Sequence, residues 1–171
     1  GYVQIYVRRG LRFEEVVLGK GGPCVAARVR LDEDEGAEGL LVAAVHLPSG
    51  ESSGKRRQIL KDVLSALGDK GSVVVVGDMN AKDEEIRDVC KELRVHEARY
   101  AGASFGVRFG HRYDRVLFGK KVWAESHLVG NGAVSFEGSE FYLSDHSGLL
   151  AYVDVCDSYD SCAKHDVVAA R

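Results

Sequence analysis

Four short segments of the chain each combine a strand-like apolar run with polar residues that can bind phosphate or a hard cation. They are LLVAAVHLPSG with His46 and Ser49, VVVVGDMN with Asp78 and Asn80, HRYDRVLF with Asp114 and Arg115, and LSDHSGLL with Asp145 and His146. In an α/β sheet, ligand groups gather in the loops at the carboxyl ends of buried strands. Because carboxylates, imidazoles and a guanidinium suit a hard cation and a phosphate, the four segments together predict metal-assisted phosphoester chemistry.

The segment GDMN places a carboxylate and an amide at a strand end. Gly77 lets the chain turn tightly. Asp78 and Asn80 lie two residues apart, so extended backbone projects them to the same side. The pair could orient an attacking water and hold a phosphoryl oxygen. The alternative is an Asx turn that only closes the strand.

The two histidine segments offer a proton carrier or a cationic contact. In SDH, Asp145 can fix the tautomer of His146 and favour its charged form, which gives an acid–base group or a phosphate clamp. The alternative is an ordinary surface dipeptide. His46 and Ser49 lie in one turn and suit a phosphate, although a histidine at a strand end is more often structural.

The segment YDR leaves two outcomes open. Asp114 can orient a catalytic group, while Arg115 either reaches phosphate or forms a buried ion pair. Residues 99–121 hold Arg or Lys at six positions against a single acid, and the chain as a whole carries a net charge of −3. This imbalance predicts a local basic surface for phosphate recognition. A solvated basic face without a ligand is the alternative.

Hydrophobic periodicity predicts an α/β chain of short strands and two amphipathic helices. Strands are expected over 2–7, 12–18, 25–31, 40–46, 73–76, 113–118, 122–128 and 149–155, and helices over 55–67 and 83–93. Ser52 or Ser53 can cap the first helix and Gly68 can end it. The strands 25–31 and 40–46 should form a hairpin, and residues 99–112 a Gly- and Arg-rich loop.

Bulk properties indicate one globular domain, taken as residues 1–155, followed by a polar tail over 156–171. The 45% hydrophobic and 29% charged content is that of an ordinary soluble protein. No apolar stretch approaches the roughly 20 residues of a membrane span. The four cysteines show no C-x-x-C spacing, which argues against zinc. Cys24 and Cys90 should be buried, and an intracellular, nuclear or organellar, reducing compartment is expected.

Taken in order, HLPS, GDMN, HRYDRVLF and SDHSGLL resemble the later motifs of the endonuclease/exonuclease/phosphatase superfamily, over roughly residues 2–155. HLPSGESSGKRRQILKDVL, GDMNAKDEE and HRYDRVLF are most similar to its 5′-tyrosyl-DNA phosphodiesterase branch. The resemblance implies a two-sheet α/β sandwich, of which this chain would be the C-terminal portion. It also implies phosphodiester hydrolysis with Mg²⁺, or Mn²⁺ as the alternative cofactor. Nucleic-acid ends are the implied partner, with 5′-phosphotyrosyl DNA adducts as the favoured substrate.

The resemblance further implies roles for individual residues. Asp78 would orient the nucleophilic water and Asn80 would contact the scissile phosphate. His146, partnered by Asp145, would stabilise the transition state or transfer a proton. The substrate would be held by five further residues, namely His46, Ser49, Phe105, Asp114 and Arg115. The metal ligands would be Asp145 and Asp78.

One departure from the family pattern bears on catalysis. The early Asn and metal-binding Glu of the family have no counterpart, because Glu14 and Glu15 lie in what resembles a later strand. Asp145 and Asp78 alone would hold a cation weakly. A second chain that supplies the N-terminal half is therefore one expectation. A catalytically inactive interaction or structural subunit is the first alternative function, and an inositol phosphate or phospholipid phosphoesterase is the second.

Overall fold

The structure, a computed structural model, describes residues 3–16, 24–30, 39–50, 52–67, 72–105, 110–130, 132, 134–137, 139–141 and 144–156. Within these residues the elements follow in the order β1 (Arg12–Val16), β2 (Cys24–Arg30), β3 (Leu40–His46), α1 (Ser53–Ala66), β4 (Val73–Asp78), α2 (Asp83–Leu93), β5 (His96–Glu97), β6 (Asp114–Phe118), β7 (Val122–Val129), β8 (Val134–Phe136), β9 (Ser139–Phe141) and β10 (Gly148–Val155).

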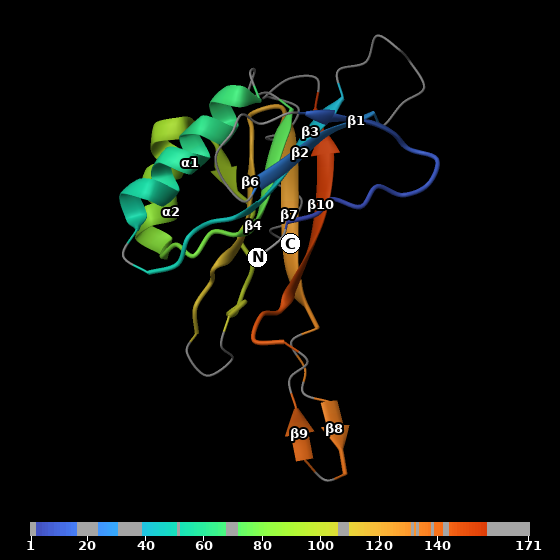
Figure 1. Cartoon of the computed structure of the whole chain (residues 1–171), viewed down its shortest axis with the longest axis vertical. Helices are drawn as coiled ribbons and strands as arrows, with labels where there is room; N and C mark the ends of the chain where they lie inside the picture. Colours follow the sequence, from blue (N-terminus) through green and yellow to red (C-terminus); the bar gives the residue numbers. More distant parts are fainter. Residues whose placement is uncertain are drawn as a thin grey trace, which may run out of the picture.

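Six strands form the main sheet, in the order β1-β2-β3-β4-β6-β5. β3 and β4 run parallel, because α1 carries the chain back across the sheet between them. The other neighbours in this sheet are antiparallel. Both helices lie on the same side of the sheet (Figure 1). The parallel pair matters for function, because β3 and β4 then end at the same edge of the sheet.

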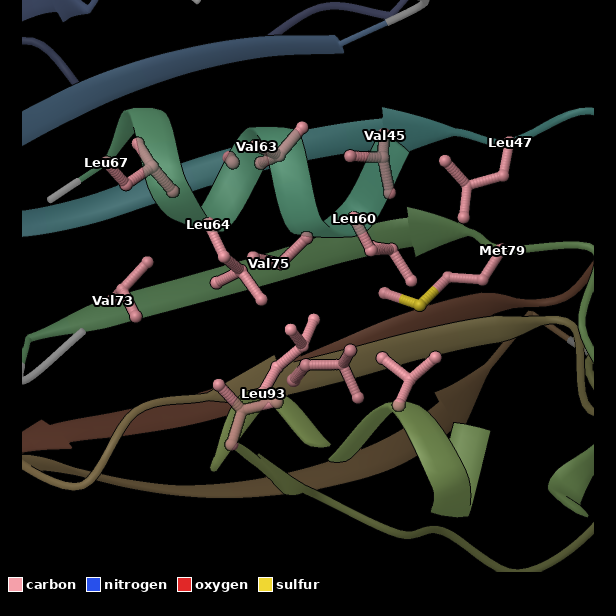
Figure 2. Close-up of a cluster of buried hydrophobic side chains, with 14 of the residues drawn as sticks. Val45, Leu47, Leu60, Val63, Leu64, Leu67, Val73, Val75, Met79 and Leu93 are labelled. Carbon is pink, nitrogen blue, oxygen red and sulfur yellow. The ribbon is translucent and has the colours of Figure 1, made fainter. Parts of the chain in front are cut away.

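The run of four valines in β4 supplies apolar side chains to both faces of the main sheet. Val73 and Val75 belong to the core beneath the helices, whereas Val74 belongs to the core on the opposite face. Figure 2 shows the helix side, where Leu60 and Leu64 of α1 lie in one cluster with Val75. Fully burying each such side chain contributes about 1.5–3 kcal/mol. A strand that is apolar on both faces therefore holds the two layers together.

The opposite face of the main sheet is covered by a second, antiparallel sheet of β7 and β10. Val122 and Ala124 of β7 pack with Val74 and Val116 of the main sheet. The helices and the second sheet therefore lie on opposite sides of the main sheet (Figure 1). The β8–β9 hairpin extends beyond this body in the same view. The predicted two-sheet α/β sandwich is confirmed.

The two predicted helices are both present. α2 spans Asp83–Leu93, as its apolar spacing predicted, and it begins with three acidic residues that favour a helix N-terminus. α1 begins at Ser53, two residues before the expected start. Ser52 occupies the N-cap position but makes no side-chain capping hydrogen bond, and the predicted stop at Gly68 lies outside the described residues.

The prediction of a strand over 2–7 is wrong for the residues that the structure describes there. Residues 3–8 have no strand assignment, although Val3, Ile5 and Val7 are half-buried and alternate with exposed neighbours. The alternation was therefore real, but a strand also needs a hydrogen-bonded neighbour. β5, with two residues, and the β8–β9 hairpin were not predicted, because such short elements carry too little periodic signal.

No helix among the described residues is long and apolar enough to cross a membrane. Cys24 and Cys90 are free and half-buried, and burial raises the pKa of the Cys90 thiol to about 11. The prediction that both cysteines are buried is therefore met only in part, and burial raises the pKa of the Cys24 thiol as well. Cys156 is disulfide-bonded. The expected polar tail lies outside the described residues from 157 onward.

Candidate active site

Three neighbouring strands bring three of the predicted site residues side by side. In the parallel β3–β4 pair, His46 is the register partner of Asp78. In the antiparallel β4–β6 pair, Asp78 is the partner of Asp114. Partnered residues on adjacent strands project to the same face of a sheet. His46, Asp78 and Asp114 therefore form a row across the end of the main sheet.

The GDMN segment is held in a local turn centred on Asp78. One carboxylate oxygen, Oδ1, accepts the backbone N–H of Asn80 at 2.8 Å, and the other, Oδ2, accepts the Asn80 side-chain amide at 2.9 Å. The same amide donates to the Leu47 carbonyl at 2.9 Å, which ties β4 to the loop after β3. Asn80 has a φ of +47°, a conformation that Asn tolerates better than most residues. Both hydrogens of its amide are thus used within the protein.

His146 joins this row from the start of β10. Its Nδ1 lies 2.8 Å from Oδ2 of Asp114, and its Nε2 lies 3.9 Å from Oδ2 of Asp78. The Nε2 atom of His46 lies 3.6 Å from the same Asp78 oxygen. The Asp78 carboxylate is therefore flanked by the imidazoles of His46 and His146. The His146 imidazole is also hydrogen-bonded to the carboxylate of Asp114.

The environment of His146 favours its protonated form. Partial burial acts to lower the pKa of His146, but the hydrogen bond to Asp114 and the negative charges of Asp114, Asp78 and Asp145 outweigh it, and the pKa is raised. Asp145 is exposed, so it acts on His146 through its charge. The predicted partnership of Asp145 and His146 is therefore secondary to the Asp114–His146 hydrogen bond.

Two further predicted residues lie at the edge of the cluster. The ring of Phe105 is 4.8 Å from the His146 ring, and the two backbones form an isolated antiparallel bridge. Tyr113 is 5.4 Å from Phe105 and stacks on His111 at 5.1 Å. Ser49 is exposed in the loop that follows His46. The Phe105 ring therefore borders the row at His146, and Ser49 lies three residues after His46 in the chain.

Arg115 follows the second alternative left open by the sequence, a buried ion pair. It is 1% exposed, and it donates to Glu97 at 2.6 Å and to Asp83 at 2.7 Å. Arg112 also binds Glu97, at 2.8 Å, and Arg99 binds it at 3.2 Å. The acids that neutralise these arginines lie at positions before residue 99. Of the basic residues predicted to form a surface over 99–121, Arg112 and Arg115 are therefore internal, whereas Arg99 and Lys120 are exposed. Arg115 does not face the cluster.

The structure adds residues that sequence reasoning missed. Arg56 is 5% exposed and pairs with both oxygens of Glu85 at 2.8 Å. It also donates to the carbonyls of Pro48 and Gly50, so it holds the loop that carries Ser49. Its position four residues before Leu60, on the apolar face of α1, was a signal that could have revealed it.

The described residues do not fit a bound divalent cation by themselves. Asp78 uses both oxygens to accept hydrogen bonds from Asn80, and Asp145 is exposed. Within the described part of the chain, no group of three or more His, Cys, Asp or Glu residues could hold a metal ion. Mg²⁺ sites rely on oxygen ligands, and the predicted pair offers too few of them.

Comparison with known proteins gives matches in structure but not in sequence. No protein-family model matches the chain, and no curated protein matches it. The endonuclease domain of TRAS1, a telomere-specific non-LTR retrotransposon, matches with a TM-score of 0.63 and 13% identity, over 86% of this chain and 70% of that one. D. rerio TDP2 complexed with a single-strand DNA product matches with a TM-score of 0.55 and 22% identity, over 85% and 68%. An endonuclease/exonuclease/phosphatase from Bacteroides vulgatus matches with a TM-score of 0.54 and 17% identity, over 86% and 65%.

These matches define the class of fold. The chain has the α/β sandwich of endonuclease/exonuclease/phosphatase proteins, as its motifs predicted. At identities of 13–22% the likeness concerns the fold, and function has to be argued from the site itself.

Proposed function

We propose that this chain carries the phosphodiester-hydrolysing site of a protein that acts on nucleic-acid ends. The single observation that carries the proposal is the convergence of His46, Asp78 and His146, with a distance of 3.6 Å from His46 and 3.9 Å from His146 to one oxygen of Asp78. Three motifs far apart in the sequence thus meet at one carboxylate, as the parts of an active site do. The DNA complex of a structurally similar TDP2 supports a nucleic-acid substrate.

In this proposal Asp78 orients the attacking water. Its carboxylate is held by Asn80 through two hydrogen bonds, so its oxygens have a fixed direction before a substrate arrives. Such preorganisation is a large part of phosphoryl-transfer catalysis. Asn80 would contact the scissile phosphate only by exchanging one of its present amide hydrogen bonds. In the free protein its role is to position Asp78.

His146 provides positive charge that the transition state requires. His146 has a raised pKa and is held by Asp114, so its imidazolium stabilises the charge that develops on the phosphoryl oxygens or donates a proton to the leaving group. His46 and Ser49 are exposed at the same end of the sheet and bind the remaining oxygens. A divalent cation, Mg²⁺ or Mn²⁺, is part of the family expectation, but it needs at least one more ligand than Asp78 and Asp145 provide.

The test is hydrolysis of a 5′-phosphotyrosyl oligonucleotide in Mg²⁺, in Mn²⁺ and in EDTA. Asp78→Asn and His146→Ala should each lower kcat by at least about 100-fold. Asp88→Asn and His127→Ala are matched controls, because both residues are exposed and neither contacts the cluster. If Asp78→Asn and His146→Ala hydrolysed the substrate as fast as their controls, the assigned roles would be wrong.

The alternative substrate class, an inositol phosphate or a phospholipid, is tested with the same protein. Single-stranded DNA and a soluble inositol phosphate would each compete with the tyrosyl oligonucleotide. Only an extended polyanion should show a steep loss of competition as salt rises. Stronger competition by inositol phosphate, with a shallow salt dependence, would indicate that the substrate belongs to the inositol phosphate or phospholipid class.

An inactive interaction subunit is the second candidate, favoured by the lack of a complete metal-binding group among the described residues. On the outer face of β10, Leu150 and Tyr152 are 45% and 56% exposed, which suits a protein contact. Titration calorimetry with Mg²⁺ separates the two candidates. Binding with a dissociation constant in the millimolar range or below would exclude the inactive form as the explanation.

A further inference from the structure

The hydroxyl of Ser104, in the loop between β5 and β6, binds the backbone of Asp114. Ser104 is 1% exposed, and its Oγ accepts hydrogen bonds from the backbone N–H groups of Tyr113 and Asp114, both at 3.0 Å. The Tyr100 hydroxyl donates to the Asp114 carbonyl at 2.8 Å. Ser104 and Tyr100 together hold both backbone polar groups of Asp114.

The backbone of Ser104 holds the segment that carries His146. Its carbonyl accepts the N–H of Ser147 at 2.7 Å. The next residue, Phe105, forms the isolated bridge with His146 and contacts the His146 ring. Asp114 begins a strand of the main sheet, whereas His146 precedes a strand of the second sheet. Ser104 thus binds both segments, although these belong to different sheets.

We propose that Ser104 is a positioning residue that sets the distance and orientation between the Asp114 carboxylate and the His146 imidazole. Loss of its hydroxyl would leave the part-buried N–H groups of Tyr113 and Asp114 without their acceptor, and polar groups withdrawn from water without partners are costly. The backbone would shift, or water would enter, to satisfy them. The 2.8 Å contact between Asp114 and His146 depends steeply on such a shift. The catalytic consequence rests on the proposed function, but the geometric consequence does not.

The experiment compares Ser104→Ala with Ser126→Ala in the full chain. Ser126 is a matched control, because it is 3% exposed and its hydroxyl makes a hydrogen bond to a single carbonyl, that of Ala98. In ¹⁵N-labelled protein, the hydrogen-bonded Nδ1 proton of His146 should give a downfield resonance, assigned by its absence in His146→Gln. Ser104→Ala should lose this resonance or shift it upfield, and Ser126→Ala should keep it.

Turnover provides a second readout. With the 5′-phosphotyrosyl oligonucleotide, Ser104→Ala should lower kcat by roughly 10- to 100-fold and leave KM within about twofold, because a misplacement near 1 Å acts on the transition state. Ser126→Ala should change neither constant. A purely structural role of Ser104 would instead lower the amount of folded Ser104→Ala protein, with the resonance and kcat of the folded fraction unchanged.

The outcomes separate the two proposals. If Ser104→Ala keeps both the resonance and kcat, the positioning role is overturned. If Ser104→Ala does not fold, Ser104→Cys replaces it, because a thiol of similar shape is a much weaker hydrogen-bond acceptor, and an unchanged resonance there would also overturn the role. If the wild-type protein hydrolyses no phosphodiester, the proposed function fails, and the resonance alone decides whether Ser104 positions the pair.

Discussion

Replacing Gly77 by alanine should destabilise the protein far more than the same change at Gly110. Both glycines have positive φ angles, +131° and +70°. A Cβ atom on Gly77 would lie 2.0 Å from the carbonyl oxygen of Val45 in β3, whereas one on Gly110 would meet no heavy atom within 4 Å. Gly77 immediately precedes Asp78, so the conflict falls where β3 and β4 present the candidate catalytic residues.

The magnitude follows from the two terms at Gly77. An L-residue in such a backbone region costs on the order of 1–3 kcal/mol. The contact with Val45 is about 1 Å shorter than Cβ atoms tolerate, so β3 and β4 must separate, which adds about 1–3 kcal/mol as in other overpacked sites. We expect a loss of about 3 kcal/mol or more for Gly77→Ala. For Gly110→Ala we expect only the cost of the backbone conformation, a loss of about 1 kcal/mol in the free energy of unfolding.

Urea unfolding followed by circular dichroism measures both variants against the wild type. The free energy of unfolding should fall at least twice as far for Gly77→Ala as for Gly110→Ala. The His46 resonances in an NMR spectrum should also move in Gly77→Ala, because Val45 precedes His46. Losses equal within about 0.5 kcal/mol would show that β3 and β4 do not approach as closely at this point as the structure has them.

Three further predictions concern the supports of the site. Arg56→Gln leaves Glu85 and two loop carbonyls without their donor, so urea unfolding should show a loss of about 3 kcal/mol; a loss below about 1 kcal/mol would contradict the buried pair. Gly54→Ala, inside α1 and open to solvent, should raise the unfolding free energy by about 0.5–1 kcal/mol, and a decrease would contradict the helix. Because the folded pKa of His146 is raised, its contribution to stability is complete below the ordinary value near 6.5 and is lost as pH rises through the folded value. The stability gap between the wild type and Asp114→Asn should therefore shrink from pH 6 to pH 9, and a gap that is constant with pH would refute the ion pair.

Much of the fold could be predicted from the sequence, because its elements carry their own periodic signals. The spacing of Ile86, Val89 and Leu93 defines α2 to the residue. The valine run predicted a strand buried on both faces, and the structure places it between the helices and the second sheet. The strand over 2–7 was predicted from alternation alone, and alternation does not specify whether a partner strand is present.

The candidate site could be predicted in part, because some of its residues carry a local signal in the sequence. His46, Asp78 and His146 were found because each combines an apolar run with a polar residue of known chemistry. The role of Arg115 could not be decided, since its partners Glu97 and Asp83 are distant in sequence and reach it only through tertiary packing. Asp114 was expected to orient a catalytic group, but its direct hydrogen bond to His146 depends on how the two sheets meet.

The order of residues by itself determined which segments become helices and strands and which side chains can carry phosphoester chemistry, because hydrophobic spacing and functional-group chemistry are local properties. Only the tertiary structure decided which of those side chains lie together, which carboxylate supports His146, and that Arg112 and Arg115 are internal. Register and sheet packing place atoms within about 3 Å of one another across dozens of residues, and no local pattern encodes such distances.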